Sequence, residues 1–547
     1  MKPSKALLLT EWLLAALITI AAVALHVKFW IHIGGLWRDE VNLINLSSHH
    51  SIAEMANDSF PVLMPLLIHG WRAVGLGNTD LDLRLLGLLI GAGILIALWI
   101  SAWKIHGAPP LFGLAMFVLN SSLIFFGDSL RAYGLGSIFV IALTASAFIF
   151  LQKPSKVRAV WFILFAILSV QVLFHNVVLV AAICFGGWAV CWRRRDRQFA
   201  FQILLVAILS AGSLLPYAES LMRTSTNSDV LRTGVSLGRF FASYEDTLGY
   251  PRSWYIYIWG LLYAVIVFHA GMVFFNSTAK PAKTDAQTLS PDLNLFAAVA
   301  LTIATIGFPL FFWRAQLPMQ SWYVLPFMAF AAVCFDATLP AFNWLFRSAL
   351  VIFATATAFM SVPATNALLN GHFSNVNLYA QQLAKFASPQ DYIIIEPWFF
   401  GITFDHYYKS STPWNTLPPI ADHTTHRFDL VQRQLQNTNA IAPVLSQIDR
   451  TLQSGHRVWI LSIPNWMGVP PARGLKPPAS LPPAPLPDTG WADWPYAHVW
   501  AAQVACLIKD HSTEFVQLKD LSTDRFITED MILFMADGWN TNSAASP

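Results

Sequence analysis

Residues 6–30 read ALLLTEWLLAALITIAAVALHVKFW, an almost continuous apolar run of the length that a helix needs to cross a bilayer. Lys2 and Lys5 precede this run, as basic residues do in a secretory signal peptide, but no small-x-small cleavage pattern follows it. Many further apolar runs come after it. We therefore expect residues 6–30 to form a retained first membrane helix.

Apolar runs of similar length recur along the first two thirds of the chain, and about eleven are candidate membrane spans. They cover 6–30, 82–103, 109–127, 133–151, 159–174, 177–192, 199–217, 254–275, 293–313, 322–340 and 345–363.

Of all residues 55% are apolar and only 12% are charged, and the mean hydropathy is +0.50, which excludes intrinsic disorder and a purely soluble enzyme. The net charge of +3 gives no support to a nucleic-acid partner. The four cysteines include no CxxC pair, so neither a disulfide framework nor a Cys-based zinc site is expected.

The basic residues of the short connecting segments fall on one side of the expected membrane. They are Lys2, Lys5, Lys104, Lys153, Lys156, Arg158, Arg193, Arg194, Arg195, Arg197, Lys280, Lys283 and Arg347. Lys and Arg gather in the cytoplasmic loops of membrane proteins. The pattern predicts a multi-pass protein of the inner (cytoplasmic) membrane, with its N-terminus inside and its C-terminus outside.

Two domains are expected from these patterns. The first is a polytopic α-helical membrane domain over 1–363, which includes an outer loop over 31–81. Within that loop the run 60–75 is apolar but too short to span comfortably, so we expect an interfacial helix. The second is an extracytoplasmic soluble α/β domain over 364–547.

The expected α/β domain is recognised by two short apolar runs. DYIIIE at 391–396 and RVWIL at 457–461 are typical of buried strands. Further expected elements are helices over 378–387 and 431–452, strands over 515–518 and 531–535, and a Pro-rich surface loop over 464–495. The histidines in the polar segments of this domain are interpreted as surface residues: His406, His423 and His426.

The stretch GGLWRDEVNLIN at 34–45 follows the first expected span and places two acids side by side, Asp39 and Glu40. Removing a carboxylate from water at a membrane surface is costly unless the group is paired. A carboxylate kept there can accept a proton from a nucleophilic hydroxyl, and burial moves its pKa toward the working pH. The alternative interpretation is a solvated acidic turn or a helix N-cap.

The order and spacing of short motifs resemble the integral-membrane glycosyltransferases of the C-type fold, and among them family 39 in the broad sense. The motifs are WRDE at 37–40, FPVL at 60–63, RL at 84–85, FFGDSLRAYGL at 125–135, HN at 175–176, SWYVLP at 321–326 and YAQQLAKFASPQDYIIIEPWF at 379–399. This group includes protein O-mannosyltransferases and the aminoarabinose transferases of lipid A. Its members move a sugar from a polyprenyl-phosphate carrier to an acceptor at the outer membrane face.

Two cations of the family pattern are missing in this chain. Phe60 stands where relatives carry His or Lys, and Val62 replaces the second Pro of the same motif. Trp322 stands where Arg usually precedes the tyrosine at position 323. Both missing cations are candidate contacts to the carrier phosphate in relatives. The resemblance therefore implies that the phosphate is held differently here or that the donor differs.

A lipid phosphate at the interface needs cations or backbone donors, and Arg offers it a planar, two-pronged contact. The candidate phosphate-binding residues are Arg131, Arg84, His175, Arg314 and Arg38, with Tyr133 and Tyr323 from the family-like segments. Each of these Arg residues is equally interpretable as an interfacial anchor. Arg131 is the preferred contact, because Asp128 and Tyr133 accompany it in a family-like segment.

Asp128 is a second acidic position, and we expect it to pair with Arg131; the alternative is that it helps to bind a metal ion. His175, Asp39 and Glu40 are a further candidate set of metal ligands, but no local ligand spacing supports that set. No cofactor is therefore predicted with certainty, and a divalent cation is left open.

The leading hypothesis is a sugar transferase that depends on a polyprenyl-phosphate donor. Asp39 would be the general base, Glu40 would position the acceptor or a metal, and Arg131 with its neighbours would hold the carrier phosphate. The expected partners are the lipid-linked sugar, membrane lipids and an unknown envelope acceptor. A lipid-linked sugar transporter or flippase is the alternative, although the repeated halves and broken midplane helices of transporters are not evident. For a third class, a membrane-anchored binding protein, eleven spans are excessive.

Overall fold

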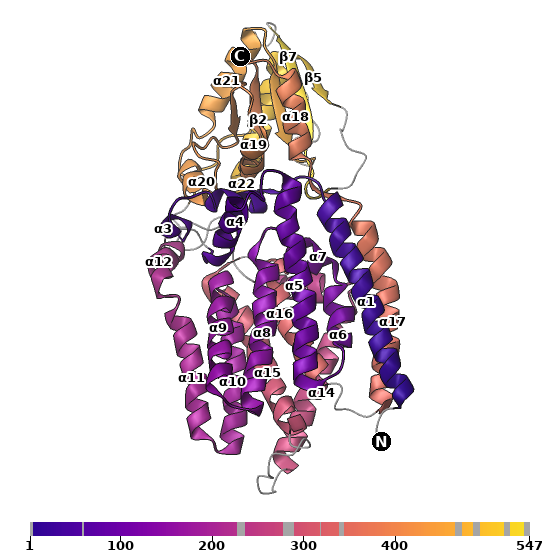
Figure 1. Ribbon diagram of the computed structural model, residues 1–547. Helices are drawn as coiled ribbons and strands as arrows, with labels where there is room; N and C mark the ends of the chain where they lie inside the picture. Colours follow the sequence, from indigo (N-terminus) through magenta and orange to yellow (C-terminus); the bar gives the residue numbers. More distant parts are fainter. Residues whose placement is uncertain are drawn as a thin grey trace. The chain divides into compact units, whose positions relative to one another are not determined.

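The computed structural model describes residues 4–56, 60–226, 236–276, 289–317, 319–338, 344–464, 473–484, 493–518 and 526–540 (Figure 1). The chain divides into two compact units. Unit 1 comprises Met1–Ile31, His50–Leu221 and Gly234–Leu369, and unit 2 comprises His32–His49, a short stretch that begins at Met222, and Asn370–Pro547.

Unit 1 is a bundle of helices (Figure 1). Its main elements are α1 (Lys5–His32), α3 (Ile52–Met55), α4 (Leu63–Ala73), α5 (Asp80–His106), α6 (Leu111–Gly113), η1 (Leu114–Val118), α7 (Ser121–Gly127), α8 (Ala132–Gln152), α9 (Lys156–Val172), α10 (Asn176–Arg194), α11 (Arg197–Gly212), α12 (Ala218–Thr226), α13 (Leu237–Leu248), α14 (Tyr255–Asn276), α15 (Leu289–Ala315), η4 (Ser321–Val324), α16 (Leu325–Thr338) and α17 (Trp344–Leu368). In the described ranges, nine helical segments are long and apolar enough to cross a bilayer. The chain is a multi-pass helical membrane protein.

Two of the eleven expected spans, 109–127 and 159–174, are not among these nine segments. The segment 109–127 is divided into α6, the π-helical turn η1 and α7, and a new helical start at Asn120 separates the last two. The buried Asp336 carboxylate accepts the backbone N–H groups of Phe112 and Gly113 at 2.9 Å each and so caps the start of α6. The Asn120 side chain accepts the backbone N–H of Ser122 at 2.9 Å and caps the start of α7. The other, α9, has 17 residues. Figure 1 shows α9 lying in the bundle beside α8 and α11.

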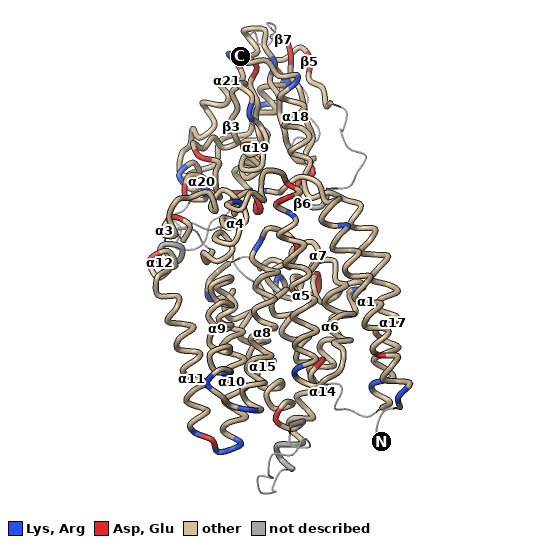
Figure 2. The backbone as a smooth tube through the Cα atoms, in the orientation of Figure 1, with Lys and Arg blue, Asp and Glu red and all other residues tan. Residues whose placement is uncertain are grey.

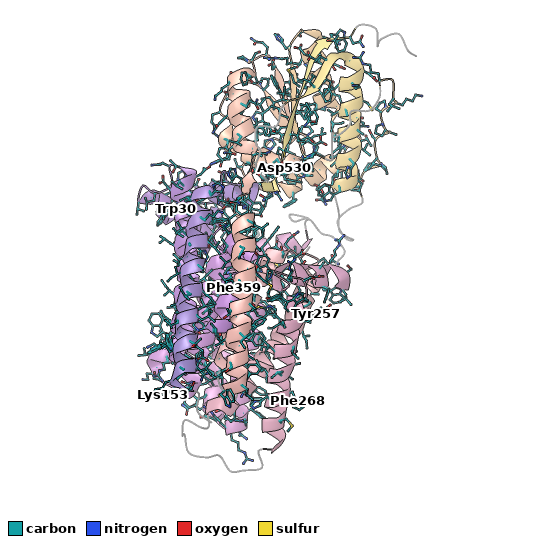
Figure 3. All side chains as sticks on the ribbon, turned by 90° about the vertical axis from the view of Figure 1, so that its right-hand side faces the viewer. Trp30, Lys153, Tyr257, Phe268, Phe359 and Asp530 are labelled. Carbon is teal, nitrogen blue, oxygen red and sulfur yellow. The ribbon has the colours of Figure 1, made fainter. Side chains whose placement is uncertain are left out.

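Charge and aromatic side chains are distributed unevenly over unit 1. Figure 2 shows the basic residues around the α10–α11 connection and at the start of α1 at the same end of the bundle. Asp292 of α15 binds the guanidinium groups of both Arg193 and Arg194 there. Exposed aromatic side chains cover outward faces of α14 and α17, among them the residues Tyr257, Phe268 and Phe359 labelled in Figure 3. Such apolar outer faces are what a lipid-facing bundle requires.

Unit 2 is built on a five-stranded mixed sheet with the strand order β3-β2-β4-β7-β5. Its strands are β2 (Tyr392–Ile395), β3 (Trp414–Thr416), β4 (Val458–Ser462), β5 (Ser512–Gln517) and β7 (Ile532–Trp539). β3, β2 and β4 are parallel, whereas β7 pairs antiparallel with both β4 and β5. The expected strands DYIIIE and RVWIL are confirmed as β2 and β4.

Both faces of this sheet are buried. Ile394 and Ile460 pair in register and belong to one apolar core, while Ile393 and Trp459 pair in register and belong to a second core. Continuous apolar runs are what a parallel sheet covered on both faces needs. The covering helices include α18 (Val376–Phe386), α19 (Gly401–Tyr407), α20 (Phe428–Leu435), α21 (Ala442–Gln453) and α22 (Trp494–His511).

Some expectations for unit 2 need adjustment. The helix expected over 431–452 is two helices, α20 and α21, with a turn between them. The Pro-rich segment 464–495 lies partly outside the described residues, and its described part 473–484 contains neither helix nor strand. Residues 32–49, expected within the outer loop of the membrane domain, group with unit 2. Backbone contact explains this grouping, because the Phe373 N–H donates to the Ile33 carbonyl at 2.9 Å.

Candidate functional site

The acidic motif opens the short helix α2 (Arg38–Leu46) of unit 2, and the two adjacent acids have different environments. Glu40 is fully buried, and its Oε2 accepts the backbone N–H of Trp37 at 3.3 Å, as a capping residue does. Trp37 is itself buried against Phe373, with ring centroids 5.8 Å apart. The side chain of Asp39 remains 14% exposed. Of the two acids, Asp39 is therefore the one that solvent reaches.

The Asp39 carboxylate has an imidazole and a guanidinium beside it. Its Oδ1 lies 3.1 Å from His426 Nε2 and 3.8 Å from Arg38 Nε. His426, interpreted from the sequence as a surface residue, is only 18% exposed and faces Asp39. The sequence contains no local signal for this pair, because the two residues are 387 positions apart.

Arg38 also contacts a third acid of unit 2, Glu529, at the end of β6 (Phe526–Glu529). Glu529 Oε1 accepts the Arg38 backbone N–H at 2.8 Å and the Thr403 hydroxyl at 3.1 Å, and Arg38 Nη1 lies 3.7 Å away. Burial raises the pKa of Glu529 to about 7, although the charge of Arg38 opposes this shift. The Arg38 guanidinium also lies 4.8 Å from the ring centroid of Phe399.

In unit 1, Arg131 lies in an aromatic environment. Its guanidinium carbon is 4.5 Å from the Phe60 ring centroid and 5.7 Å from that of Tyr133, and Nη2 is 3.4 Å from the Tyr133 hydroxyl. Arg131 is 3% exposed. Phe60, which replaces a family cation, is thus a cation–π partner of the preferred phosphate contact.

Three more rings extend the cluster around Arg131. The ring centroid of Tyr323 is 5.8 Å from that of Tyr133 and 5.6 Å from that of His175. Phe312 stacks on Tyr323 with an interplanar angle of 11°. His175 Nε2 is buried and has no hydrogen-bond partner in the part of the chain that the structure describes. The structure therefore brings together four of the expected phosphate-binding residues: Arg131, Tyr133, His175 and Tyr323.

Arg84 and Arg314, two further members of the expected set, are placed differently. Arg84 of α5 is 2% exposed, and its guanidinium carbon lies 5.7 Å from the Phe29 ring centroid. Arg314 is exposed near the end of α15.

The expected pair between Asp128 and Arg131 is not formed, and Asp128 pairs with His26 of α1 instead. Asp128 Oδ2 lies 2.6 Å from His26 Nδ1, and both side chains are almost completely buried. Room for the pair comes from Gly91 of α5, where an added Cβ would lie 2.3 Å from Asp128 Oδ1 and 2.7 Å from His26 Nδ1. The sequence did not reveal this distant partner of Asp128, because the two residues are 102 positions apart.

A metal centre is not assembled among the described residues, since no group of three or more His, Cys, Asp or Glu side chains is arranged to hold an ion there. The divalent cation left open by the sequence stays an open prediction.

No protein-family model matches this sequence, and no curated protein does. Among solved structures, the chain is similar to ArnT from Cupriavidus metallidurans bound to undecaprenyl phosphate, with 12% identity, coverage of 83% of this chain and 94% of ArnT, and a TM-score of 0.48. It is also similar to the Archaeoglobus fulgidus oligosaccharyltransferase in complex with zinc and sulfate, at 12% identity, 81% and 67% coverage and a TM-score of 0.45.

A third similar structure is the arabinofuranosyltransferase AftD from Mycobacteria, at 13% identity, with coverage of 96% of this chain and 40% of AftD and a TM-score of 0.39. These neighbours are membrane glycosyltransferases of the C-type fold, the group that the sequence motifs resemble. The TM-scores of these three structures are below 0.5, and the similarity identifies no substrate, donor or catalytic residue of this chain.

Proposed function

We propose that this protein transfers a sugar from a polyprenyl-phosphate donor to an envelope acceptor at the outer face of the membrane, with Asp39 as the catalytic base. The observation that carries the proposal is the setting of Asp39. It is an acid that solvent reaches, and one of its oxygens is already occupied by His426 at 3.1 Å. A carboxylate fixed in this way is suited to accept a proton from an acceptor hydroxyl.

The proposed reaction is a single displacement. The acceptor hydroxyl gives its proton to Asp39 while its oxygen attacks the anomeric carbon, and the bond from that carbon to the phosphate oxygen breaks. The polyprenyl phosphate leaves with the electron pair. Phosphate is a good leaving group, so one carboxylate suffices where hydrolases use two, and the configuration at the anomeric carbon inverts.

Arg131 is proposed to hold the carrier phosphate. Its guanidinium is fixed between the Phe60 ring and Tyr133, and it is almost completely buried. In such a dry aromatic environment a charge-assisted hydrogen bond is stronger than in water. Tyr133, His175 and Tyr323 would complete the phosphate contacts.

The sidedness of the protein is also a proposal. The basic residues at one end of unit 1 in Figure 2 support a cytoplasmic location for that end. The inner membrane would then hold the membrane domain 1–363, and the α/β domain 364–547 would be extracytoplasmic.

The test is turnover by the purified protein in lipid nanodiscs with polyprenyl-phosphate-linked sugars and envelope fractions as acceptors. We expect release of polyprenyl phosphate only when an acceptor is present, and a product of inverted configuration identified by mass spectrometry and NMR. Retained configuration would overturn the displacement mechanism. Movement of an intact donor across the bilayer without release of phosphate would instead favour the transporter alternative.

A further inference from the structure

A loop of unit 2, residues 421–427, lies along one face of α2. The Asn45 side-chain amide donates to the Thr424 carbonyl at 2.7 Å, and the His426 backbone N–H donates to Asn42 Oδ1 at 2.9 Å. His426 Nε2 then reaches Asp39 Oδ1 at 3.1 Å. Asp39, Asn42 and Asn45 are three positions apart, so they share a helix face. One face of α2 therefore forms hydrogen bonds with the loop at three successive positions.

The loop is held in shape by Arg427. Its Nε and Nη2 each donate to Asp429 at 2.8 Å, and its Nη1 donates to Asp422. Asp422 Oδ1 also accepts the backbone N–H of Thr424 at 2.9 Å and the Thr424 hydroxyl at 2.6 Å. The hydrogen bonds from Arg427 hold the pKa of Asp429 below its usual value, against the opposing effect of burial. Arg427 and Asp429 therefore both remain charged at neutral pH.

The surroundings of the His426 ring indicate whether His426 or Asp39 is accessible to the proton of an acceptor hydroxyl. The ring stacks on Phe428 with centroids 5.6 Å apart and meets Trp398 edge-on at 6.5 Å. His426 Nδ1 is buried and has no hydrogen-bond partner within the described ranges, and Nε2 is occupied by Asp39. No nitrogen of this imidazole is thus open to an acceptor hydroxyl, whereas Asp39 is partly exposed.

We infer that His426 is a positioning residue for Asp39, supplied by the α/β unit. The Nε2–H of His426 donates to Oδ1 of Asp39, which orients the carboxylate for its proposed task as the base. This inference rests on the proposed function and adds a task for the α/β unit, because loop 421–427 completes the setting of the base.

The test compares His426→Phe with His426→Gln in the purified full-length protein. Phe keeps a flat ring for stacking but has no donor, whereas the Gln side-chain amide can donate to Asp39. A charge-assisted hydrogen bond supports an expected loss in kcat of about ten- to hundredfold for the Phe variant, with the KM for the lipid donor unchanged. Gln should restore part of kcat. His423→Gln changes another imidazole of the same loop and serves as the matched control.

Unchanged kcat in folded His426→Phe would overturn the inference, and so would equal losses in the Phe and Gln variants. If the Phe variant does not fold, His426→Leu takes its place as the variant without a donor, with the same expected loss in kcat and the same overturning result. Asp39→Asn in the same assay distinguishes a failure of the positioning role of His426 from a failure of the proposed function. If Asp39→Asn is inactive while His426→Phe is fully active, only the positioning role fails. If Asp39→Asn is active, the proposed function itself fails.

Discussion

Within the described ranges, two His–Asp pairs have opposite characters. In the helical unit, His26 and Asp128 meet at 2.6 Å, and their side chains are 2% and 0% exposed. In the α/β unit, His426 and Asp39 meet at 3.1 Å and are 18% and 14% exposed. The His26–Asp128 pair, here called the sealed pair, is closed to water, so it can hold helices together but cannot exchange protons with a substrate. The His426–Asp39 pair, here called the open pair, is partly exposed and can exchange protons. The same two residue types therefore serve structure in one unit and are proposed to serve chemistry in the other.

The largest effect is expected from breaking the sealed pair. His26→Leu leaves the buried Asp128 carboxylate without its partner, and loss of one member of a buried pair costs about 3–5 kcal/mol of unfolding free energy. Denaturant unfolding of the purified protein in detergent measures this loss. Lys28→Met on the same helix is the control, because Lys28 binds Asn366 at an exposed position. Equal stability of the two variants would show that the sealed pair has no structural task.

The next effect concerns pH and the acid that shares Arg38 with the open pair. The pKa of Glu529 is raised to about 7 in the folded protein, so the native state holds a proton that the unfolded chain releases near pH 4.5. Stability is therefore full at low pH and falls as the pH rises toward 7, by about 3 kcal/mol in all. Glu529→Gln should flatten this slope and be more stable than wild type at pH 8. A wild-type slope that persists in the variant would contradict the assignment.

A smaller effect is expected at Arg131, which lies three positions after Asp128 of the sealed pair. Arg131→Ala should lower kcat/KM for the lipid donor about ten- to hundredfold, as the loss of a charge-assisted hydrogen bond predicts. Arg131→Lys should recover only part, since an ammonium lacks the planar fork. Because Asp128 is paired with His26, removing Arg131 leaves no unpaired acid, but it removes the buried contacts to Phe60 and Tyr133, so a moderate fall in melting temperature is expected beside the loss in donor use. A large fall in melting temperature with unaltered donor dependence would make Arg131 structural.

Local patterns in the sequence were sufficient for much of the fold. Apolar runs located the long helices, and the runs at 391–396 and 457–461 located the two central strands β2 and β4. The division of 109–127 was missed, because the new helix within it starts at Asn120, whose side chain accepts the backbone N–H of Ser122. Hydropathy counts apolar residues in a window and does not register a single polar residue that caps a new helix inside an apolar run.

The same limit applies to the candidate site. Family-like motifs identified Arg131, Tyr133, His175 and Tyr323, and the structure places these in one aromatic cluster. The partners of the two key acids were missed, because His26 and His426 have no motif of their own and reach Asp128 and Asp39 only through tertiary packing. A histidine in a polar segment is indistinguishable from a surface residue until the helix that it contacts is known.

Asp39 of the open pair is proposed to be the catalytic base, and Asp39→Asn tests this proposal most directly. The substitution keeps the shape of the side chain and removes its ability to take a proton. General-base catalysis contributes about 10²–10⁴-fold, so turnover with saturating donor and acceptor should fall by at least about a hundredfold. Melting temperature and membrane insertion should match those of wild type and of Glu514→Gln, an exposed acid on β5 that serves as control. Near wild-type turnover by folded Asp39→Asn would contradict the account.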